Sequence, residues 1–277
     1  MKYVVAVSGG VDSVVLLDML VKSTDNEVII AHFEHGIRGE SSEADARFVE
    51  ALGAKYAVVC EVGFGDLGKK ASEETARMKR YEFLKSVASK HKGQLVTAHH
   101  QNDLVESIAI NLSRGTGWRG LAVFGDTSIE RPLLHMTKNE IYDYALKHKL
   151  EWVEDETNTT DMYLRNRLRR KLALLSSAKR QRLVELYERQ IEIKQLVTEQ
   201  ANQFPVTSRY FLTMVEEQVA LELLFTLLAR EGMSLTRPQR KRLLLAIKTA
   251  KVGDTFQAGG NISVRFTLRE FIVNSPL

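Results

Sequence analysis

The sequence of 277 residues has a single cysteine, Cys60, only four prolines and only two tryptophans. One cysteine cannot form a disulfide within the chain, and it cannot build a zinc site or metal cluster that needs several cysteines. No apolar run approaches the roughly 20 residues that span a bilayer. The opening MKYVVAV is too short for the apolar core of a signal peptide. We therefore expect a cytoplasmic protein that does not enter a membrane.

Acidic residues are scarce in the last part of the chain. Residues 1–160 have 19 lysines and arginines against 24 aspartates and glutamates, whereas residues 161–277 have 20 against 11. The net charge of +4 is therefore the sum of an acidic first part and a basic second part. Such asymmetry is typical of a chain that binds a polyanion, although a solvated basic face would give the same counts.

Short apolar runs alternate with amphipathic stretches through the first half of the chain. Runs rich in β-branched residues predict four buried parallel strands, at 3–7, 28–33, 55–59 and 94–99. Helical periodicity predicts helices near 13–22, 41–52, 72–91, 102–113 and 137–148. Thr137 and Glu140 fit a capping box at the start of the last helix. The alternation predicts an α/β domain, with a parallel twisted sheet and helices on both faces.

From about residue 165 the pattern becomes helical and more charged. Further helices are predicted at 178–201, 213–231 and 237–250. The tail GDTFQAGGNISVRFTLREFIVN predicts a hairpin or a small sheet with turns at its glycines. We place a boundary near residue 176, with the α/β domain at 1–176. Residues 177–277 are expected to form a helical linker and a smaller, mainly helical domain with a terminal hairpin.

The joint between the first strand and the first helix reads SGGVDS. A helix N-terminus has unpaired N–H groups and a dipole that favours an anion. Gly9 and Gly10 let the backbone approach a bulky anion, and Ser8 and Ser13 add hydroxyl donors. The string lacks the lysine of GxxxxGK[ST], and it is not GxGxxG. Asp12 would repel a phosphate unless Mg²⁺ lay between them, so we expect a phosphate site with a metal.

This string resembles the pyrophosphate loop of the N-type ATP pyrophosphatases. The resemblance implies a Rossmann-like fold of the adenine-nucleotide α-hydrolase type. It also implies that the loop holds the β- and γ-phosphates of ATP while a substrate attacks the α-phosphate. The products would be an adenylylated substrate and pyrophosphate. The residues expected at the nucleotide from this loop are Ser8, Gly9, Gly10, Val11, Asp12 and Ser13.

Further stretches narrow the resemblance. In chain order they are HFEHGIRGESSEAD, EETARMKRYEFL, TAHHQNDLVES, RGTGWRGL, IERPLLHMTKNEI and EDETNTTDMYLRNRLRRKLA. From residue 3 to about 172 the chain is similar to tRNA(Ile)-lysidine synthetases. The resemblance implies a ligase that adenylylates the C2 carbonyl oxygen of the wobble cytidine in a CAU anticodon. The ε-amine of lysine then displaces AMP, and the lysidine that forms reads AUA instead of AUG.

The same resemblance implies the substrates and partners of the chain. They are ATP with Mg²⁺, free L-lysine and tRNA(Ile), and a homodimer is left open. The region 177–277 would then contain a small tRNA-binding domain.

Charged residues in these motifs fit the implied chemistry. Asp103 and Glu106 follow His99 and His100 and lie three apart, so they share one helix face. They could bind Mg²⁺, orient the lysine ammonium or take its proton. For Asp103 the alternative is a charge that complements the helix dipole. Asp12 and Asp103 are the expected metal ligands.

Arginines supply the positive charge of the implied site. Arg77 matches the family arginine that faces the α-phosphate and the cytidine, and a guanidinium suits phosphoryl charge. Arg165 and Arg169 match the family's RNxxR motif, which borders the active site. The residues expected to contact tRNA are Arg38, Arg80, Asn166, Arg167, Arg170 and Lys171. The residues expected at the nucleotide outside the pyrophosphate loop are His32, Arg114 and Gly115.

The chain departs from the family pattern at several positions. Phe33 and Glu34 stand between the two histidines of HFEHG, and Asn102 with Asp103 replaces a pair of aspartates. The second change leaves open how many carboxylates bind the metal. Two other functions stay open as alternatives: a tRNA thiolase, against which the single cysteine argues, and an inactive tRNA-binding relative. The intact loop together with Asp103 argues against decay of the site. For Arg80 the alternative is a surface salt bridge.

Overall fold

The computed structural model describes residues 1–23, 25–34, 40–65, 73–126, 128–153, 168, 172 and 174–274. These form two compact units, Met1–Gln190 and Ile191–Leu277. The division falls inside the long helix α7 (Ser177–Ala201), whereas the sequence places a boundary near residue 176. The first half of α7 belongs to the first unit, where Glu188 lies 3.7 Å from His135. Among the described helices, none combines the length and apolarity that crossing a bilayer requires.

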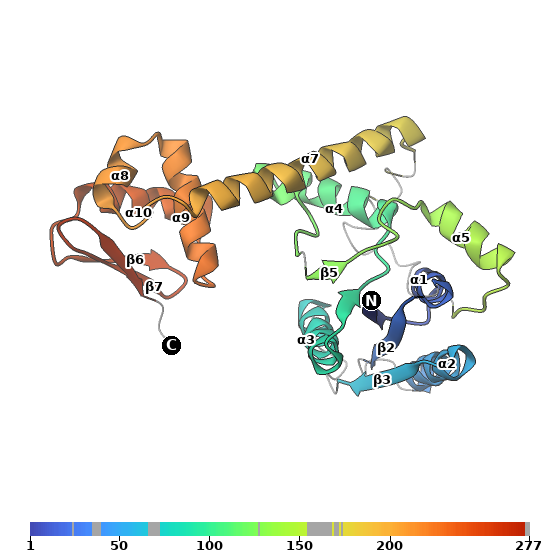
Figure 1. The fold of residues 1–277 in the computed structure, drawn as a ribbon. Helices are drawn as coiled ribbons and strands as arrows, with labels where there is room; N and C mark the ends of the chain where they lie inside the picture. The colour runs from blue at the N-terminus through green and yellow to red at the C-terminus, as the bar shows by residue number, and fades with distance from the viewer. Residues whose placement is uncertain are drawn as a thin grey trace. The chain divides into compact units, whose positions relative to one another are not determined.

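The first unit is built on a five-stranded parallel sheet in the order β3-β2-β1-β4-β5 (Figure 1). Its strands are β1 (Lys2–Ala6), β2 (Glu27–Glu34), β3 (Val59–Phe64), β4 (Gln94–Val96) and β5 (Ile129–Glu130). The chain builds outward from β1 to β3 and then crosses to β4 on the other side of β1. In open α/β sheets, ligands bind outside the carboxyl ends of the strands at such a reversal.

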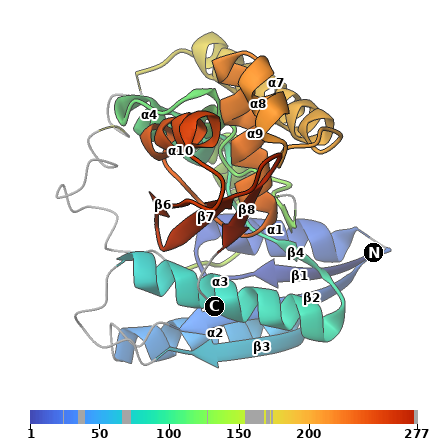
Figure 2. The same ribbon diagram turned by 90° about the vertical axis from the view of Figure 1, so that its left-hand side faces the viewer.

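Helices cover both faces of this sheet, as the alternation of the sequence predicts. They are α1 (Val11–Lys22), α2 (Glu40–Tyr56), α3 (Glu73–His91), α4 (Gln101–Ser113) and α5 (Lys138–Lys147), with a 3₁₀ turn η1 (Trp118–Leu121). Val5 and Ile30 pack in the core beneath α1, α2 and α5. Val4 and Ile29 point to the opposite face and pack against α3. Figures 1 and 2 show α1 and α3 on opposite sides of the sheet. The α/β fold is confirmed.

Two local predictions in this unit are wrong. The run 55–59 was expected to be a strand, but Lys55 and Tyr56 end helix α2 and the strand begins at Val59. Tyr56 is apolar enough to fit a strand pattern, yet its hydroxyl donates to Asp18 on α1 at 2.8 Å, which requires the helical position. Ala57 then ends the helix with a φ of +54°. The strand expected at 94–99 ends at Val96, and the next residues turn into the site described below.

The second unit continues from α7 with α8 (Arg209–Met214), α9 (Glu217–Arg230) and α10 (Arg237–Thr249). The helix expected at 213–231 is α9, which starts only at Glu217, because Val215 and Glu216 have extended backbone angles and separate it from α8. The tail forms an antiparallel sheet of three strands, β6 (Thr255–Gly259), β7 (Ile262–Phe266) and β8 (Phe271–Asn274). Apolar residues of these helices and strands share one core.

A buried carboxylate links three helices of the first unit. Asp18 of α1 is 2% exposed and accepts hydrogen bonds from the hydroxyls of Tyr56 on α2, at 2.8 Å, and Tyr144 on α5, at 2.9 Å. Lys22 Nζ lies 2.8 Å from the same carboxylate. Burial by itself would raise the pKa of Asp18, but hydrogen bonds from Lys22, Tyr56 and Tyr144 outweigh it and hold the pKa below its ordinary value. Burial, together with Asp18, raises the pKa of Tyr144 to about 12.

We expect Asp18→Asn to lower the free energy of unfolding at pH 7 by about 1–3 kcal/mol, because the buried donors lose a charged acceptor. The folded pKa of Asp18 lies below the unfolded value of about 3.9. Its stabilisation is therefore complete above the unfolded pKa and is lost as pH falls through the folded one. Urea unfolding between pH 7 and pH 3 would measure this.

The control is Asp143→Asn, at an exposed carboxylate of α5. The unmutated protein and this control should lose stability with acid more steeply than Asp18→Asn. Parallel curves for all three proteins would contradict the role assigned to Asp18.

Candidate active site

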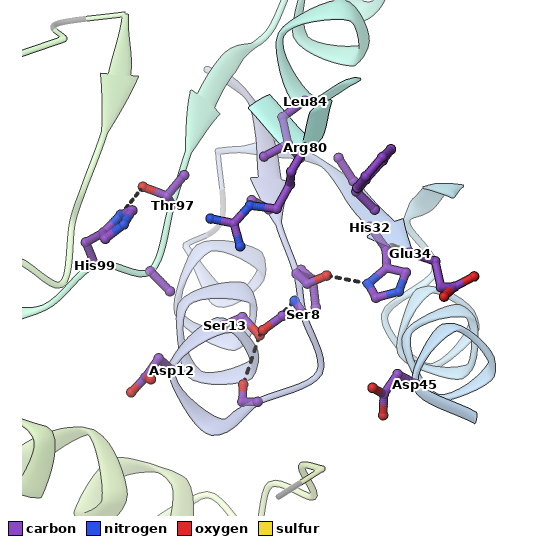
Figure 3. A pocket seen from close by; sticks show the side chains of 16 residues that line it. Ser8, Asp12, Ser13, His32, Glu34, Asp45, Arg80, Leu84, Thr97 and His99 are labelled. Carbon is purple, nitrogen blue, oxygen red and sulfur yellow. Dashed lines mark hydrogen bonds between the residues drawn. The ribbon is translucent and has the colours of Figure 1, made fainter. Parts of the chain in front are cut away.

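A cavity of about 550 Å³ opens at the carboxyl ends of β1, β2 and β4 (Figure 3). The strand order reverses at this point, because β2 and β4 lie on opposite sides of β1. Its size lies in the range of about 300–1,000 Å³ that holds small molecules. The first turn of α1, Asp45 of α2, and Arg80 and Leu84 of α3 complete the wall. The lining residues are Ala6, Val7, Ser8, Gly10, Asp12, Ser13, Ala31, His32, Phe33, Glu34, Asp45, Arg80, Leu84, Thr97, Ala98 and His99.

The SGGVDS turn leaves the start of α1 open to this cavity. Gly9 has a φ of +90°, a conformation that favours glycine, and its carbonyl accepts a hydrogen bond from the Val153 N–H at 3.0 Å. Gly10 is the N-cap and has no side chain to cap the helix. A Cβ on Gly10 would meet only Ser8 Oγ, at 3.7 Å. The first N–H groups of α1 are therefore accessible to an anion in the cavity.

The two serines of the turn have different roles. Ser13 is buried, and its hydroxyl donates to the Gly10 carbonyl at 2.8 Å and accepts from the Ser8 N–H at 3.2 Å. Ser13 thus holds the shape of the turn, whereas Ser8 is exposed to the cavity. Val11 is buried in the core, so only its backbone can serve a ligand.

Asp12 pairs with a lysine that the sequence analysis did not select. Lys138 Nζ, from the first residue of α5, donates to both carboxylate oxygens of Asp12 at 2.7 and 2.8 Å. His100 Nε2 lies 3.8 Å from Asp12 Oδ1 and 3.5 Å from Asp103 Oδ2. The two expected metal ligands therefore approach the same imidazole. The signal in the sequence was a lysine directly after the N-cap Thr137, where a positive charge opposes the helix dipole.

Asp103 also caps its own helix. Its Oδ2 accepts from the His100 N–H at 3.1 Å, while His100 Nδ1 accepts from the Asn102 N–H at 3.2 Å. Asp103 thus lies in the first turn of α4, where its charge complements the helix dipole, and it approaches the same imidazole as Asp12. Glu106 follows one turn later on α4 and is buried.

The described residues contain no group of three or more histidine, cysteine or acidic side chains that could bind a metal by themselves. Asp12 and Asp103 fit Mg²⁺ in the way it is usually bound beside a nucleotide, through one or two carboxylates and several phosphate oxygens. Lys138 neutralises the Asp12 carboxylate.

Arg80, rather than Arg77, lines the cavity. Its guanidinium extends from α3 into the space bounded by Ser8, Ser13 and Thr97 (Figure 3). The Arg80 Nε is buried and has no hydrogen-bond partner within the described residues. Arg77 lies one turn earlier, is exposed and rests over the Tyr81 ring at 5.0 Å from its centroid. The geometry therefore gives Arg80 the position nearest to a bound anion.

His32 presents a second unpaired group to the cavity. The ring is 5% exposed, and its Nδ1 lies 2.8 Å from the Val7 carbonyl oxygen. A carbonyl only accepts, so Nδ1 carries a proton and donates it. The buried Nε2 has no partner in the described part of the chain. In the neutral ring it is an acceptor, suited to a ligand hydroxyl or amine.

The remaining expected site residues lie elsewhere. Arg114 is the C-cap of α4 and Gly115 follows it with a φ of +68°, and neither lines the cavity. Those that lie outside the described residues are Arg38, Arg165, Asn166, Arg167, Arg169, Arg170 and Lys171. Cys60 is half-buried on β3, and burial together with Glu50 and Glu61 raises the pKa of its thiol to about 11.

Comparison with known proteins agrees with this geometry. A family model described as the PP-loop domain matches residues 1–175. The tRNA(Ile)-lysidine synthase of Anaplasma marginale is 37% identical over 185 residues, which cover 62% of this chain and 39% of that protein. The tRNA(Ile)-lysidine synthase of Bacillus subtilis is 39% identical over 182 residues, 60% of this chain and 39% of that protein. The chain thus spans about two-fifths of the length of these curated relatives.

A solved structure shares the fold. The U34-tRNA thiolase NcsA from Methanococcus maripaludis, with its [4Fe-4S] cluster, superposes with a TM-score of 0.59 at 18% identity. The match covers 69% of this chain and 73% of that chain. At this identity the likeness concerns the fold alone.

We expect Arg80→Met to weaken ATP binding by about 10- to 100-fold, the effect of losing a hydrogen bond to a charged group. Arg77→Met, three residues away on the same helix, is the matched control and should bind ATP nearly as the unmutated protein does. Isothermal titration calorimetry with ATP would measure both. A larger loss of ATP affinity in Arg77→Met than in Arg80→Met would show that Arg77, and not Arg80, contacts the nucleotide.

Proposed function

The chain belongs to the PP-loop family, and on this basis we propose that it is a tRNA(Ile)-lysidine synthase. It would use ATP to activate the C2 carbonyl of the wobble cytidine in a CAU anticodon, and then join lysine to that carbon. The proposal rests chiefly on the cavity where the uncapped N-terminus of α1, Ser8 and Arg80 face one space beside Asp12. The names of the relatives supply the substrates.

In the first step the α1 amides and Ser8 bind the β- and γ-phosphates, and Arg80 faces the α-phosphate. The C2 oxygen of the cytidine attacks the α-phosphorus, the bond to the bridging oxygen breaks, and pyrophosphate leaves. The negative charge that develops on the transferring phosphoryl group is then stabilised by hydrogen-bond donors that are already oriented, which lowers the barrier. Mg²⁺, when bound by Asp12 and Asp103, would neutralise part of the phosphate charge.

His32 fits the sugar of the nucleotide. Its Nδ1 is committed to the Val7 carbonyl, so the Nε2 lone pair is fixed in direction. A ribose hydroxyl would supply the proton donor that this buried acceptor lacks.

In the second step the ε-amine of lysine attacks C2 and AMP leaves. An ammonium has no lone pair, so a base must take a proton before attack. Asp103 and Glu106 on α4 are the candidates that orient the ammonium and accept its proton. Both lie near the carboxyl end of β4, on the same face of their helix.

The basic part of the chain would bind the tRNA. We assign this role to the RNxxR segment with Arg165 and Arg169, and to the region 177–277, where α10 exposes several basic side chains. They are Arg237, Lys241, Arg242 and Lys248. Phosphate contacts of this kind position an RNA without reading its bases. Use of tRNA and free lysine is consistent with a cytoplasmic enzyme.

The two alternatives are less well supported. A thiolase needs a reactive sulfur or a cysteine-bound cluster, whereas the single Cys60 has a raised pKa and does not line the cavity. An inactive tRNA-binding relative would not need an open phosphate turn. It also would not need two buried nitrogens beside the cavity, on His32 and Arg80, that have no hydrogen-bond partner among the described residues.

We expect the protein to incorporate labelled lysine into an unmodified tRNA(Ile) transcript with a CAU anticodon, in the presence of ATP and Mg²⁺. A tRNA(Met) transcript with the same anticodon is the substrate control and should remain unlabelled. Adenylylation of some other substrate, with no lysine incorporation, would retain the pyrophosphatase chemistry and discard lysidine synthesis.

Asp12→Ala should abolish adenylylation and leave tRNA binding nearly unchanged, because Asp12 acts at the phosphates and the metal. Asp143→Ala, at an exposed carboxylate of α5, is the protein control and should retain activity. Release of pyrophosphate and a filter-binding assay with tRNA would measure the two effects. Pyrophosphate release by Asp12→Ala at the rate of the unmutated protein would show that this loop is not part of the active site.

Binding of tRNA should weaken steeply with salt if the basic part of the chain meets phosphates. Six or more such contacts would reduce the association constant by about 10³-fold or more between 50 and 200 mM salt. Filter binding across this range would give the slope. A flat response would show that the basic residues do not contact the tRNA backbone.

A further inference from the structure

Lys138 has the geometry of a group that belongs to the phosphate site. Its ammonium bonds both oxygens of Asp12 and also lies 4.9 Å from the centroid of the Tyr142 ring. Asp12 lines the cavity, and the Lys138 and Asp12 side chains are 30% and 31% exposed, so solvent can reach the pair. A ligand entering the site can therefore compete for either partner.

Helix stability does not explain the lysine. Lys138 is the first residue of α5, directly after the N-cap Thr137, where a positive charge meets the positive end of the dipole. Asp12, in the first turn of α1, has the favourable sign for its own helix and does not need a counter-ion there. The pair therefore costs α5 some stability and gives α1 little. A role in ligand binding accounts for a lysine at this position.

Three helix N-termini meet around this pair. Asp12 is the second residue of α1, His100 is the N-cap of α4 and lies 3.8 Å from Asp12, and Lys138 starts α5. The Asn102 side-chain oxygen accepts a hydrogen bond from the Lys138 N–H at 3.4 Å, which joins α4 to α5. The dipoles of all three helices point their positive ends to one place, a field that suits an ion with several negative charges.

A metal–nucleotide complex cannot share Asp12 with Lys138. A divalent cation at this carboxylate would repel the ammonium, since two positive charges would then lie within a few ångströms. The nearest new anion for the ammonium would be the β- and γ-phosphates on the adjacent α1 amides. The lysine needs only side-chain rotation to change partners, because its backbone is fixed by the capping box of α5.

We propose that Lys138 binds the pyrophosphate portion of the nucleotide. It pairs with Asp12 as the structure shows, and it moves to the β- and γ-phosphates when the metal–nucleotide complex binds. When the bond between the α-phosphorus and the bridging oxygen breaks, the ammonium stabilises the charge on the leaving pyrophosphate. This inference rests on the proposed function, because it needs ATP in the cavity.

The test compares Lys138→Met and Lys138→Arg with Lys147→Met, an exposed lysine at the other end of α5. Calorimetry would measure binding of ATP, pyrophosphate and AMP. Lys138→Met should bind ATP and pyrophosphate about 10- to 100-fold more weakly. AMP has neither the β- nor the γ-phosphate, so its binding should be unchanged. Lys138→Arg should recover much of the loss, and Lys147→Met should bind all three as the unmutated protein does.

A second measurement uses Mn²⁺ without nucleotide, followed by the electron paramagnetic resonance of the free ion. Lys138→Met exposes the Asp12 carboxylate and should bind Mn²⁺ several-fold more tightly, opposite in sign to the ATP effect. A lysine that only stabilised the fold would lower the binding of AMP as much as that of ATP. Unchanged ATP and pyrophosphate binding in Lys138→Met, or an equal loss of AMP affinity, would overturn the role assigned to Lys138 and leave the proposed function standing. Failure of the unmutated protein to bind ATP or pyrophosphate would overturn the proposed function as well.

Discussion

The first two N–H groups of α1, those of Val11 and Asp12, have no carbonyl one turn earlier to pair with, whereas the Ser13 N–H bonds the Gly10 carbonyl. The site is arranged around these first two groups. Helices α4 and α5 solve the same problem with side-chain caps, His100 and Thr137. Gly10 supplies no cap for α1, and the positive φ of Gly9 turns the preceding backbone so that a cavity can form against it. The unsatisfied amides therefore fall where the sheet reverses its order, with Arg80 on the opposite wall.

Two aspartates on α1 show how differently a carboxylate can be satisfied. Asp18 is enclosed by two tyrosines and Lys22, all from packed helices, and this arrangement suits a permanent structural link. Asp12 lies six residues closer to the cavity, where Lys138, 30% exposed, pairs with it and His100 lies 3.8 Å away. Replacing its partner requires no rearrangement of the core. Asp18 thus fixes the packing of α1, whereas Asp12 can exchange its partner without disturbing that packing.

The sequence could predict much of this because its strongest signals are local. The string SGGVDS, the alternation of strands and helices, and the capping box of Thr137 and Glu140 depend on neighbours in the chain. It could not separate Arg80 from Arg77, because both lie on one helix and only the tilt of α3 against the sheet decides which one enters the cavity. Lys138 was missed since its partner is 126 residues away. The strand expected at 55–59 failed because a tyrosine serves a buried helix face as well as a strand.

Helix α5 touches α1 at two points that are six residues apart on each helix: Lys138 with Asp12, and Tyr144 with Asp18. Six residues of helix rise by about 9 Å, so the two contacts lie about that far apart. Together they fix the axial register of α5 against α1 as well as the distance between the two helices. A slide of α5 by one residue would break both at once. Alignment at the phosphate site is thereby coupled to the packing of a half-buried tyrosine farther along α5. Substitutions near Tyr144, well away from any substrate, would consequently alter catalysis through alignment rather than chemistry.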